Sequence, residues 1–173
     1  MRLSVGSKIS YPIQGPCRIG PVVTKVVGGE PMEFHQFIPI GEGGAEFLVP
    51  LGHTAAVGVR RLLEASEIPE VLARLTRPAL AGTRNRTSEH LRLFATGAAL
   101  DLADAIASLT EINGANRLVN GEHGLLEKAR RLLAREIAEV LGESDAAAEA
   151  RIDDALAAGG RAPRARGKAP RGL

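Results

Sequence analysis

Aromatic residues are scarce in this chain: Trp is missing, and Phe and Tyr together make up 3% of its 173 residues. A hydrophobic core must therefore be built mainly from Leu, Ile, Val and Ala. The hydrophobic content of 45% is ordinary for a globular protein, so such a core is available. The length accommodates one ordinary domain or two small ones.

Cysteine and long apolar runs are also lacking. Cys17 is the single cysteine, which excludes an internal disulfide and indicates a reducing compartment. The sequence has no run of about 18 apolar residues, the length that a membrane span requires. The first residues, Met1 to Ser4, lack the apolar stretch of a signal peptide. We therefore expect a soluble, cytoplasmic protein with no membrane partner.

Patterns of catalytic residues are missing as well. The sequence contains no nucleophile elbow, Walker loop or dinucleotide fingerprint. The histidines have no metal-ligand spacing to each other or to Cys17; they are His35, His53, His90 and His123. We therefore expect no enzyme, cofactor, metal or small-molecule substrate. The remaining enzyme hypothesis, a hydrolase, would require a metal at His35 and Cys17.

The first third of the sequence is patterned as β-structure. The predicted strands are Lys8 to Pro12, Cys17 to Val27, Met32 to Ile40 and Ala45 to Pro50. Gly28-Gly29 is a hairpin signal. Pro21 cannot donate a ladder hydrogen bond, which places its strand at an edge or a bulge. Several short strands at this spacing predict a small, strongly bent SH3-like barrel.

From Val57 onward the pattern becomes helical. We expect a helical turn at Arg60 to Glu64, followed by a compact bundle of short amphipathic helices. These predicted helices are Ile68 to Thr76, Thr87 to Thr96 with Thr87 or Ser88 as the N-cap, Ala98 to Ile112, Gly121 to Leu141 capped by Asn120, and Ser144 to Leu156. The leucine stripe of the fourth helix drifts off a strict heptad, which favours a core face over a zipper. The predicted fold class is α+β, with a β-barrel domain at residues 1–65 and an all-α domain at 66–158.

Charge is distributed unevenly along the chain. Residues 1–65 carry 6 basic and 5 acidic groups, residues 66–158 carry 11 and 15, and residues 159–173 carry 5 basic groups and no acidic ones. The last segment has little to bury, so we expect a disordered basic tail. Two hypotheses stay open for it: an arm attracted to nucleic-acid phosphates, or a solubilising terminus without a specific role.

A second basic cluster lies within the acidic helical part. Between residues 71 and 100 a single acidic residue, Glu89, stands among five arginines, which are Arg74, Arg77, Arg84, Arg86 and Arg92. A cluster of this kind is a natural docking place for a DNA backbone. The alternative is a solvated helix face that binds nothing.

The predicted strand around Phe47 carries a further hypothesis. At a sheet edge it would accept a strand from another protein, with main-chain hydrogen bonds providing affinity and side-chain pockets providing choice. In the alternative, Phe47 and Val49 fill the barrel core while Leu48 faces solvent.

Several short motifs occur in an order that resembles the bacterial CarD/CdnL family. The N-terminal motifs are Val5 to Pro12, Gly15, Gly29-Glu30, Val49-Pro50 and Val57 to Arg60. The C-terminal motifs are Gly97 at a helix end and Leu118 to Glu136, which includes Lys128-Ala129-Arg130 and Leu132-Leu133. The first set is similar to the RNA-polymerase-interacting domain of this family, a module also similar to one in transcription-repair coupling factor. The match spans about residues 5–158.

The resemblance implies a function and the residues that carry it. A Tudor-like N-terminal domain would pair with the β subunit of RNA polymerase through Glu46, Phe47, Leu48, Val49 and Pro50, with Lys25 as a basic contact on the neighbouring strand. The helical domain would contact upstream promoter DNA and stabilise the open complex. Its DNA contacts would fall on Thr83, Arg84, Asn85, Arg86 and His123. The implied location is cytoplasmic and nucleoid-associated.

The sequence also departs from the family pattern. Thr83 stands where the family typically has a Trp that wedges into the minor groove, and Thr supplies neither that area nor stacking. Basic residues are also replaced at Asn85, Ser88, His123 and Gly124, each of which removes a phosphate contact. Two hypotheses therefore stand: a transcription regulator that bridges polymerase and promoter, and an interaction adaptor without a DNA role.

Overall fold

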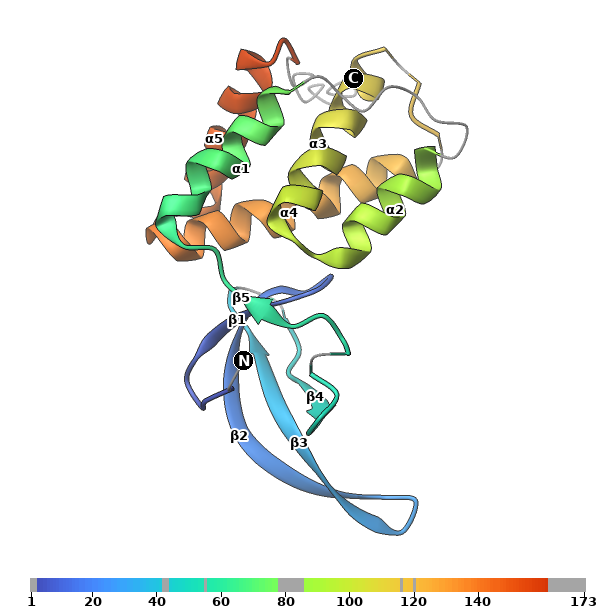
Figure 1. Cartoon of the computed structure of the whole chain (residues 1–173), viewed down its shortest axis with the longest axis vertical. Coiled ribbons are helices and arrows are strands. Elements are labelled where there is room, and N and C mark those ends of the chain that lie inside the picture. The colour runs from blue at the N-terminus through green and yellow to red at the C-terminus, as the bar shows by residue number, and fades with distance from the viewer. Residues whose placement is uncertain are drawn as a thin grey trace, which may run out of the picture.

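The structure is a computed structural model that describes residues 3–41, 44–54, 56–77, 86–115, 117–119 and 121–161; the side chain of Arg86 lies outside this description. A sheet lies at one end of the molecule and a group of helices at the other (Figure 1). The strands are β1 (Lys8–Tyr11), β2 (Gly15–Val27), β3 (Glu30–Pro39), β4 (Phe47–Pro50) and β5 (Arg60–Arg61). The helices are the short 3₁₀ helix η1 (Ala65–Glu67), α1 (Ile68–Thr76), α2 (Arg86–Thr96), α3 (Ala99–Gly114), α4 (Glu122–Leu141) and α5 (Asp145–Ala158). The α+β class with the sheet first is therefore confirmed.

The sheet is antiparallel throughout, with strand order β4-β3-β2-β1-β5. In the described residues, the outer strands β4 and β5 do not pair with each other, so the expected barrel is not closed. The β2–β3 hairpin extends away from the helices beyond the other strands (Figure 1). Gly28 and Gly29 form its turn with φ of 63° and 89°, the left-handed backbone that a tight hairpin needs. The register shifts between Ile19 and Val22, which confirms the bulge expected at Pro21.

One local prediction in the linker was wrong. Arg60 and Arg61 form strand β5 instead of a helical turn, because they pair with Ser10 and Ile9 of β1. Pairing with a segment 50 residues earlier in the sequence overrides the local pattern. The first helical residues are those of η1, and α1 follows directly from it.

The predicted helices are present, with differences at their ends. The α2 helix begins at Arg86, so neither Thr87 nor Ser88 is its N-cap. The N-cap of α4 is Gly121, and Asn120 lies outside the described residues. Ser144 does cap α5, since its hydroxyl accepts a hydrogen bond from Ala147 N at 3.2 Å. None of the helices in the described ranges is both long and apolar enough to cross a bilayer.

Two hydrophobic clusters hold the molecule together. The helical cluster is aliphatic apart from Phe94, and it contains the leucine stripe of α4, as expected of a core face. The sheet cluster differs from the expectation of an aliphatic core. The fully buried ring of Phe37 lies at its centre, with Tyr11 at a ring-centroid distance of 5.8 Å and Phe47 at 5.5 Å. The scarce aromatic residues are thus concentrated where the sheet needs large side chains.

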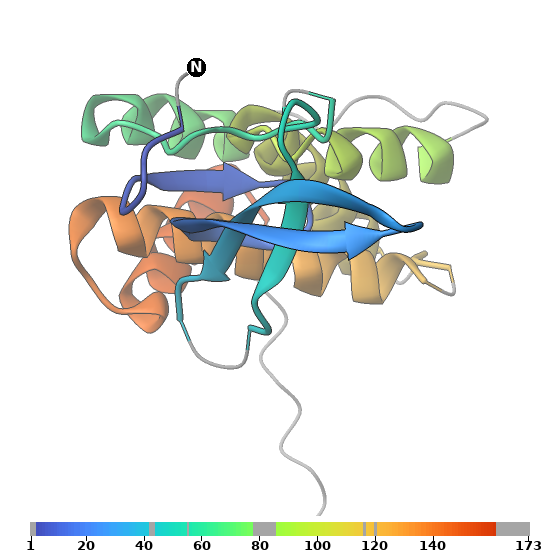
Figure 2. The same cartoon turned by 90° about the horizontal axis from the view of Figure 1, so that it is seen from below.

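Sheet and helices meet at a charged, closely packed junction. The guanidinium of Arg60 donates to both carboxylate oxygens of Glu136 in α4, at 2.6 and 2.7 Å. The same carboxylate accepts hydrogen bonds from Leu63 N at 3.0 Å and from the Ser10 hydroxyl at 3.4 Å. Lys8 forms a second ion pair with Glu139. Seen from the sheet end, the strands lie in front of the helices (Figure 2).

Candidate partner-binding surfaces

Strand β4 forms one edge of the sheet. In the described part of the chain its only partner strand is β3, with Phe47 opposite Phe37 and Val49 opposite His35. Leu51 N donates to Glu33 O at 3.0 Å in the same register. Since hydrogen-bonded positions alternate along an antiparallel strand, the backbone groups of Phe47 and Val49 also bond to β3. The backbone N–H and C=O of Leu48 therefore point away from the sheet.

The two faces of β4 have different roles. The side chains of Phe47 and Val49 belong to the sheet core, whereas Leu48 lies on the opposite face and is half-buried. The outward carbonyl of Pro50 accepts a hydrogen bond from His53 N at 3.1 Å. The edge that a partner strand could use therefore ends at this residue. Core filling and an available edge thus coexist in one strand, because side chains and backbone groups point in different directions.

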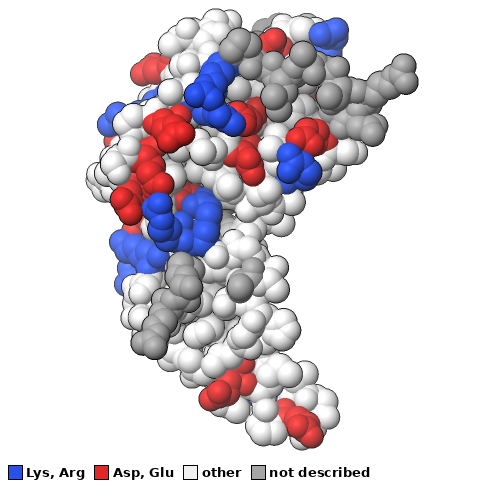
Figure 3. All heavy atoms as spheres, viewed as in Figure 1, with Lys and Arg blue, Asp and Glu red and all other residues white. Residues whose placement is uncertain are grey.

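Of the two other residues predicted to contact polymerase, Glu46 lies beside this edge and Lys25 does not. Glu46 directly precedes β4, and its carboxylate accepts a hydrogen bond from Gln36 Nε2 at 2.5 Å. Lys25 is exposed on β2 opposite Met32, and β3 separates it from β4. The structure therefore brings Glu46 to Pro50 together and places Lys25 two strands away, on the protruding hairpin. That hairpin shows mostly uncharged atoms and two acidic patches on the face in Figure 3.

Of the predicted DNA residues, the structure describes His123 and the backbone of Arg86. Thr83, Arg84 and Asn85 are outside the described residues, as is the side chain of Arg86. His123 is exposed in the first turn of α4. The hydroxyl of Thr87 donates to Glu122 at 2.9 Å, which holds the start of α2 against the start of α4. Arg86 and His123 are each adjacent in sequence to this hydrogen-bonded pair.

A buried polar network supports this contact between the two helix starts. The Glu122 carboxylate also accepts from Val119 N at 3.0 Å, and its Oε1 lies 4.0 Å from His90 Nδ1. The other ring nitrogen of His90 lies 2.8 Å from the Ser108 hydroxyl. Serine, histidine and glutamate also occur together in hydrolases, but these three residues are at most 4% exposed. We interpret the network as structural support, because buried side chains do not meet a substrate.

Most arginines of the predicted basic cluster that the structure describes are paired with acidic groups. Arg74 donates to Asp104 at 2.7 and 2.9 Å, and Arg92 donates to Glu89 at 2.6 and 3.0 Å. These contacts raise the pKa of both guanidiniums, mainly through the hydrogen bonds to the carboxylates. Arg77, at the end of α1, is exposed. The described part of the cluster is thus closer to a solvated face than to a bare cationic patch.

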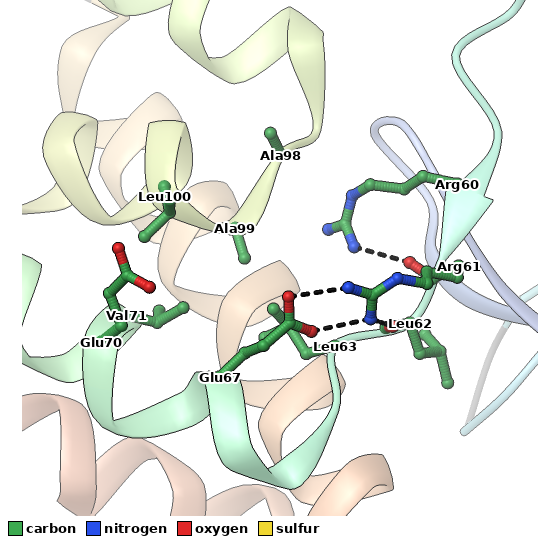
Figure 4. Close-up of a pocket in the computed structure, with 10 residues that line it drawn as sticks. All are labelled: Arg60, Arg61, Leu62, Leu63, Glu67, Glu70, Val71, Ala98, Ala99 and Leu100. Atoms are coloured by element: carbon green, nitrogen blue, oxygen red, sulfur yellow. Dashed lines mark hydrogen bonds and ion pairs between the residues drawn. The ribbon is translucent and has the colours of Figure 1, made fainter.

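A cavity of about 290 Å³ lies between the linker after β5 and helices α1 and α3 (Figure 4). Its apolar lining includes Leu63, Val71 and Leu100. On its wall the Arg61 guanidinium donates to both oxygens of Glu67, at 2.7 and 2.8 Å. This hydrogen bonding lowers the pKa of Glu67 to about 2. Arg61 and Glu67 thus neutralise each other, while Glu70 is a further acidic residue of the lining.

Metal binding finds no support in the described ranges, where no cluster of His, Cys, Asp and Glu suits a metal ion. Cys17 is fully buried, and desolvation raises the pKa of its thiol to about 12. A thiol of this kind stays protonated, whereas metal ligation needs the thiolate. Cys17 lies opposite Pro39 in the sheet, four residues along β3 from His35, so the two hydrolase candidates are not adjacent.

Comparison with known protein families identifies the helical part of the chain. A model of the CarD C-terminal domain matches residues 67–153, which begin in η1 and end within α5. The chain belongs to the CarD/CdnL family. Members of this family are transcription factors without enzymatic activity, so the chain is a CarD-like, transcription-related protein.

In this CarD-family protein the matched region covers α1 to α4, most of α5, and all the buried residues of the helical cluster except Ala155 and Leu156. The sheet lies outside the matched region and connects to it through Arg60 and Glu136. Glu136 is part of a family motif in the sequence, but the motif does not indicate its role. The signal for that role is an acidic residue within an otherwise apolar helix stripe, which requires a buried cation as its partner.

Proposed function

We propose that this protein docks on the β subunit of RNA polymerase through the free edge of β4 and contacts promoter DNA through its helical part to stabilise the open complex. Residues 1–65 would form the polymerase-interacting domain, and residues 66–158 the DNA-contacting domain. The observation that carries the proposal is the outward backbone of Leu48 on an edge strand, in a chain of the CarD family.

The edge supports strand addition for a physical reason. Leu48 offers one N–H and one C=O in the plane of the sheet, where a foreign antiparallel or parallel strand would bond to them. The inward side chains of Phe47 and Val49 hold the strand in place, so it is ordered before the partner arrives. A pre-ordered edge lowers the entropic cost of association.

A proline at residue 48 tests this docking mode directly. Leu48→Pro removes the outward N–H while leaving the ladder between β4 and β3 intact, because residue 48 does not bond to β3. We expect binding to the purified polymerase β subunit to weaken about tenfold, which corresponds to the loss of one hydrogen bond. Leu48→Ala, which keeps the N–H, should weaken it less. Biolayer interferometry with the full chain measures both.

A matched control comes from the helical part. Leu91 is an exposed leucine on α2, so Leu91→Arg introduces the same side chain as Leu48→Arg at a distance from the sheet. We expect Leu48→Arg to abolish polymerase binding and Leu91→Arg to preserve it. If all the Leu48 variants bound the β subunit as tightly as the parent protein does, docking through β4 would be excluded.

A second function, an adaptor that binds polymerase without a DNA role, is favoured by the ion pairs on the helical surface. Arg74 and Arg92 are engaged by Asp104 and Glu89, and Thr83 replaces the family Trp. A gel shift on promoter DNA separates the two functions. A salt-sensitive shift by the polymerase complex that polymerase alone does not give, weakened by Arg84→Ala/Arg86→Ala, supports the bridging function. If the complex shifts the promoter DNA no more than polymerase alone does, the result supports the adaptor.

A further inference from the structure

The cavity between the linker after β5 and helices α1 and α3 has walls that the protein itself holds in place. The backbone N–H of Leu63 donates to buried Glu136 at 3.0 Å, which attaches the linker to α4. The Glu67 carboxylate accepts from Arg61 at 2.7 and 2.8 Å and from Glu64 N at 2.7 Å, which holds the linker against the start of α1. A preformed cavity lowers the entropic cost of binding a ligand.

The interior of this cavity is small and mainly apolar. Its lining includes Leu63, Val71, Ala99 and Leu100, of which Val71 and Ala99 are buried residues of the helical cluster. The short side chains of Ala98 and Ala99 leave space at the start of α3 that larger residues would fill. The volume of about 290 Å³ is close to the lower limit of ligand pockets, about 300 Å³. A small organic molecule with an apolar body fits this space.

The rim of the cavity carries more carboxylates than its ion pairs use. Arg61 is paired with Glu67 at 2.7 Å and with Glu64 at 3.5 Å. Glu70 is exposed, and no hydrogen bond or ion pair joins it to another residue within the described ranges. Figure 4 shows its carboxylate beside Leu100, away from the Arg61–Glu67 pair. One side of the cavity therefore has a negative charge next to an apolar wall.

The other guanidiniums near this rim are bound to carboxylates of their own. Arg74 lies one helical turn after Glu70, but its Nε and Nη2 donate to Asp104 at 2.7 and 2.9 Å. Arg60 donates to both oxygens of Glu136, at 2.6 and 2.7 Å. Since each of these cations has a closer acidic partner, the charge of Glu70 is left for a ligand.

The start of α3 is the part of the lining that could attract an anion. Ala98 is the N-cap of this helix and makes no side-chain capping hydrogen bond. The first turn contains Asp101, however, and a carboxylate there offsets the partial positive charge of a helix N-terminus. An anionic ligand would also meet Glu70, whereas a cation meets a complementary charge.

We propose that this cavity binds a small organic amine, with its ammonium group beside Glu70 and its apolar body against Val71 and Leu100. An ammonium has three donors and no acceptor, which suits a carboxylate without a partner. The ligand would contact the linker and both helices at once, so it would stabilise the junction between sheet and helices. This site goes beyond the proposed function and does not depend on the polymerase or DNA contacts.

The site is tested by titrating the isotope-labelled full chain with phenethylamine at neutral pH and following amide chemical shifts by NMR. We expect saturable shifts at Val71, Ala99 and Leu100. Phenethyl alcohol has a similar body without the charge, and it should bind about threefold more weakly, the scale of an exposed ion pair. Hydrocinnamate, which is an anion, should bind more weakly still. Absence of saturable shifts at these residues would overturn the site, and equal or tighter binding of the alcohol or the anion would overturn its preference for amines.

The position of the ammonium group is tested by charge removal. Glu70→Gln keeps the size of the side chain, so it should weaken amine binding about threefold and leave binding of the alcohol unchanged. Glu127→Gln removes the same charge from an exposed position on α4 and serves as the matched control. If Glu70→Gln bound the amine as tightly as the parent protein does, or if Glu127→Gln weakened it equally, the assignment to Glu70 would be wrong.

The position of the apolar body is tested by filling the cavity. Ala98→Leu places a larger side chain in the lining, and we expect amine and alcohol to bind about tenfold more weakly. Far-ultraviolet circular dichroism checks that this variant keeps the parent's helical content. Unchanged binding of both molecules by the folded variant would exclude the cavity as their site. Leu48→Pro should leave amine binding unchanged, so failure of polymerase docking and failure of this site are distinguishable.

Discussion

Glu136 shows how one residue can determine the geometry of this molecule. The residue is 1% exposed, and its carboxylate accepts hydrogen bonds from Arg60, Leu63 and Ser10. A buried carboxylate is tolerated only when cations and donors surround it, and here they all come from the sheet side or the linker. The same residue is therefore part of the helical core and the attachment point of the sheet.

Replacing this carboxylate should destabilise the protein measurably. Glu136→Gln keeps the size of the side chain but leaves the Arg60 guanidinium without its counter-charge. We expect the free energy of unfolding to fall by about 2 kcal/mol. This loss is smaller than for a fully buried ion pair, because Arg60 is partly exposed. Urea denaturation measures the loss. Glu139→Gln is the matched control; its partner Lys8 is exposed, so we expect a loss below about 1 kcal/mol.

At the scale of elements, the turn between α2 and α3 is shaped by its contact with the sheet. Gly97 has φ of +64°, and an added Cβ would stand 3.0 Å from Pro12 Cα. The Gly97 carbonyl accepts two hydrogen bonds from Arg60, at 2.7 and 3.1 Å. Only a residue without a Cβ meets the left-handed backbone and the close approach at once.

The turn provides a clean test of this packing. Gly97→Ala should lower the free energy of unfolding by about 1–3 kcal/mol, from the left-handed backbone together with the clash against Pro12. Gly114→Ala, at the end of α3, meets nothing within 4 Å and should be neutral or slightly stabilising. Thermal unfolding followed by circular dichroism compares the two. A neutral Gly97→Ala would contradict the close contact.

At the scale of the whole molecule, two hydrophobic clusters are coupled by a polar junction. Tyr11 belongs to the sheet cluster and is the single tyrosine of a chain without Trp, so intrinsic fluorescence reports on the sheet. Far-ultraviolet circular dichroism at 222 nm reports mainly on the five α-helices described. The protein therefore offers separate probes for its two parts without any label.

These probes test whether sheet and helices unfold together. We expect the urea transitions of the two signals to coincide in the parent protein, because the junction around Glu136 joins both clusters. In Glu136→Gln the tyrosine transition should move to lower urea than the helical transition. Separate transitions in the parent would mean that the junction does not couple the two parts, and the fixed spacing between the proposed partner sites would then be lost.

Much of the element pattern is predictable because it depends on neighbours in sequence. The apolar stripe of α4, the helix start at Ser144 and the Gly28-Gly29 hairpin follow from local periodicity and backbone preference, and all are present in the structure. The strand at Arg60–Arg61 was missed because its partner lies 50 residues away in β1. The closed barrel was wrong because strand spacing predicts the number of strands but not whether the outer two will pair.

The amino-acid sequence alone therefore determined the two-part α+β organisation, the lack of catalytic motifs and the family, since these depend on composition and on short patterns. Tertiary structure decided which residues carry the junction and the surfaces. Which way the backbone of Leu48 points depends on its pairing with β3, and the burial of Glu136 and Arg161 depends on helices and strands far away in the chain. The partner that each of these groups meets is decided by packing between distant segments, and local patterns do not specify it.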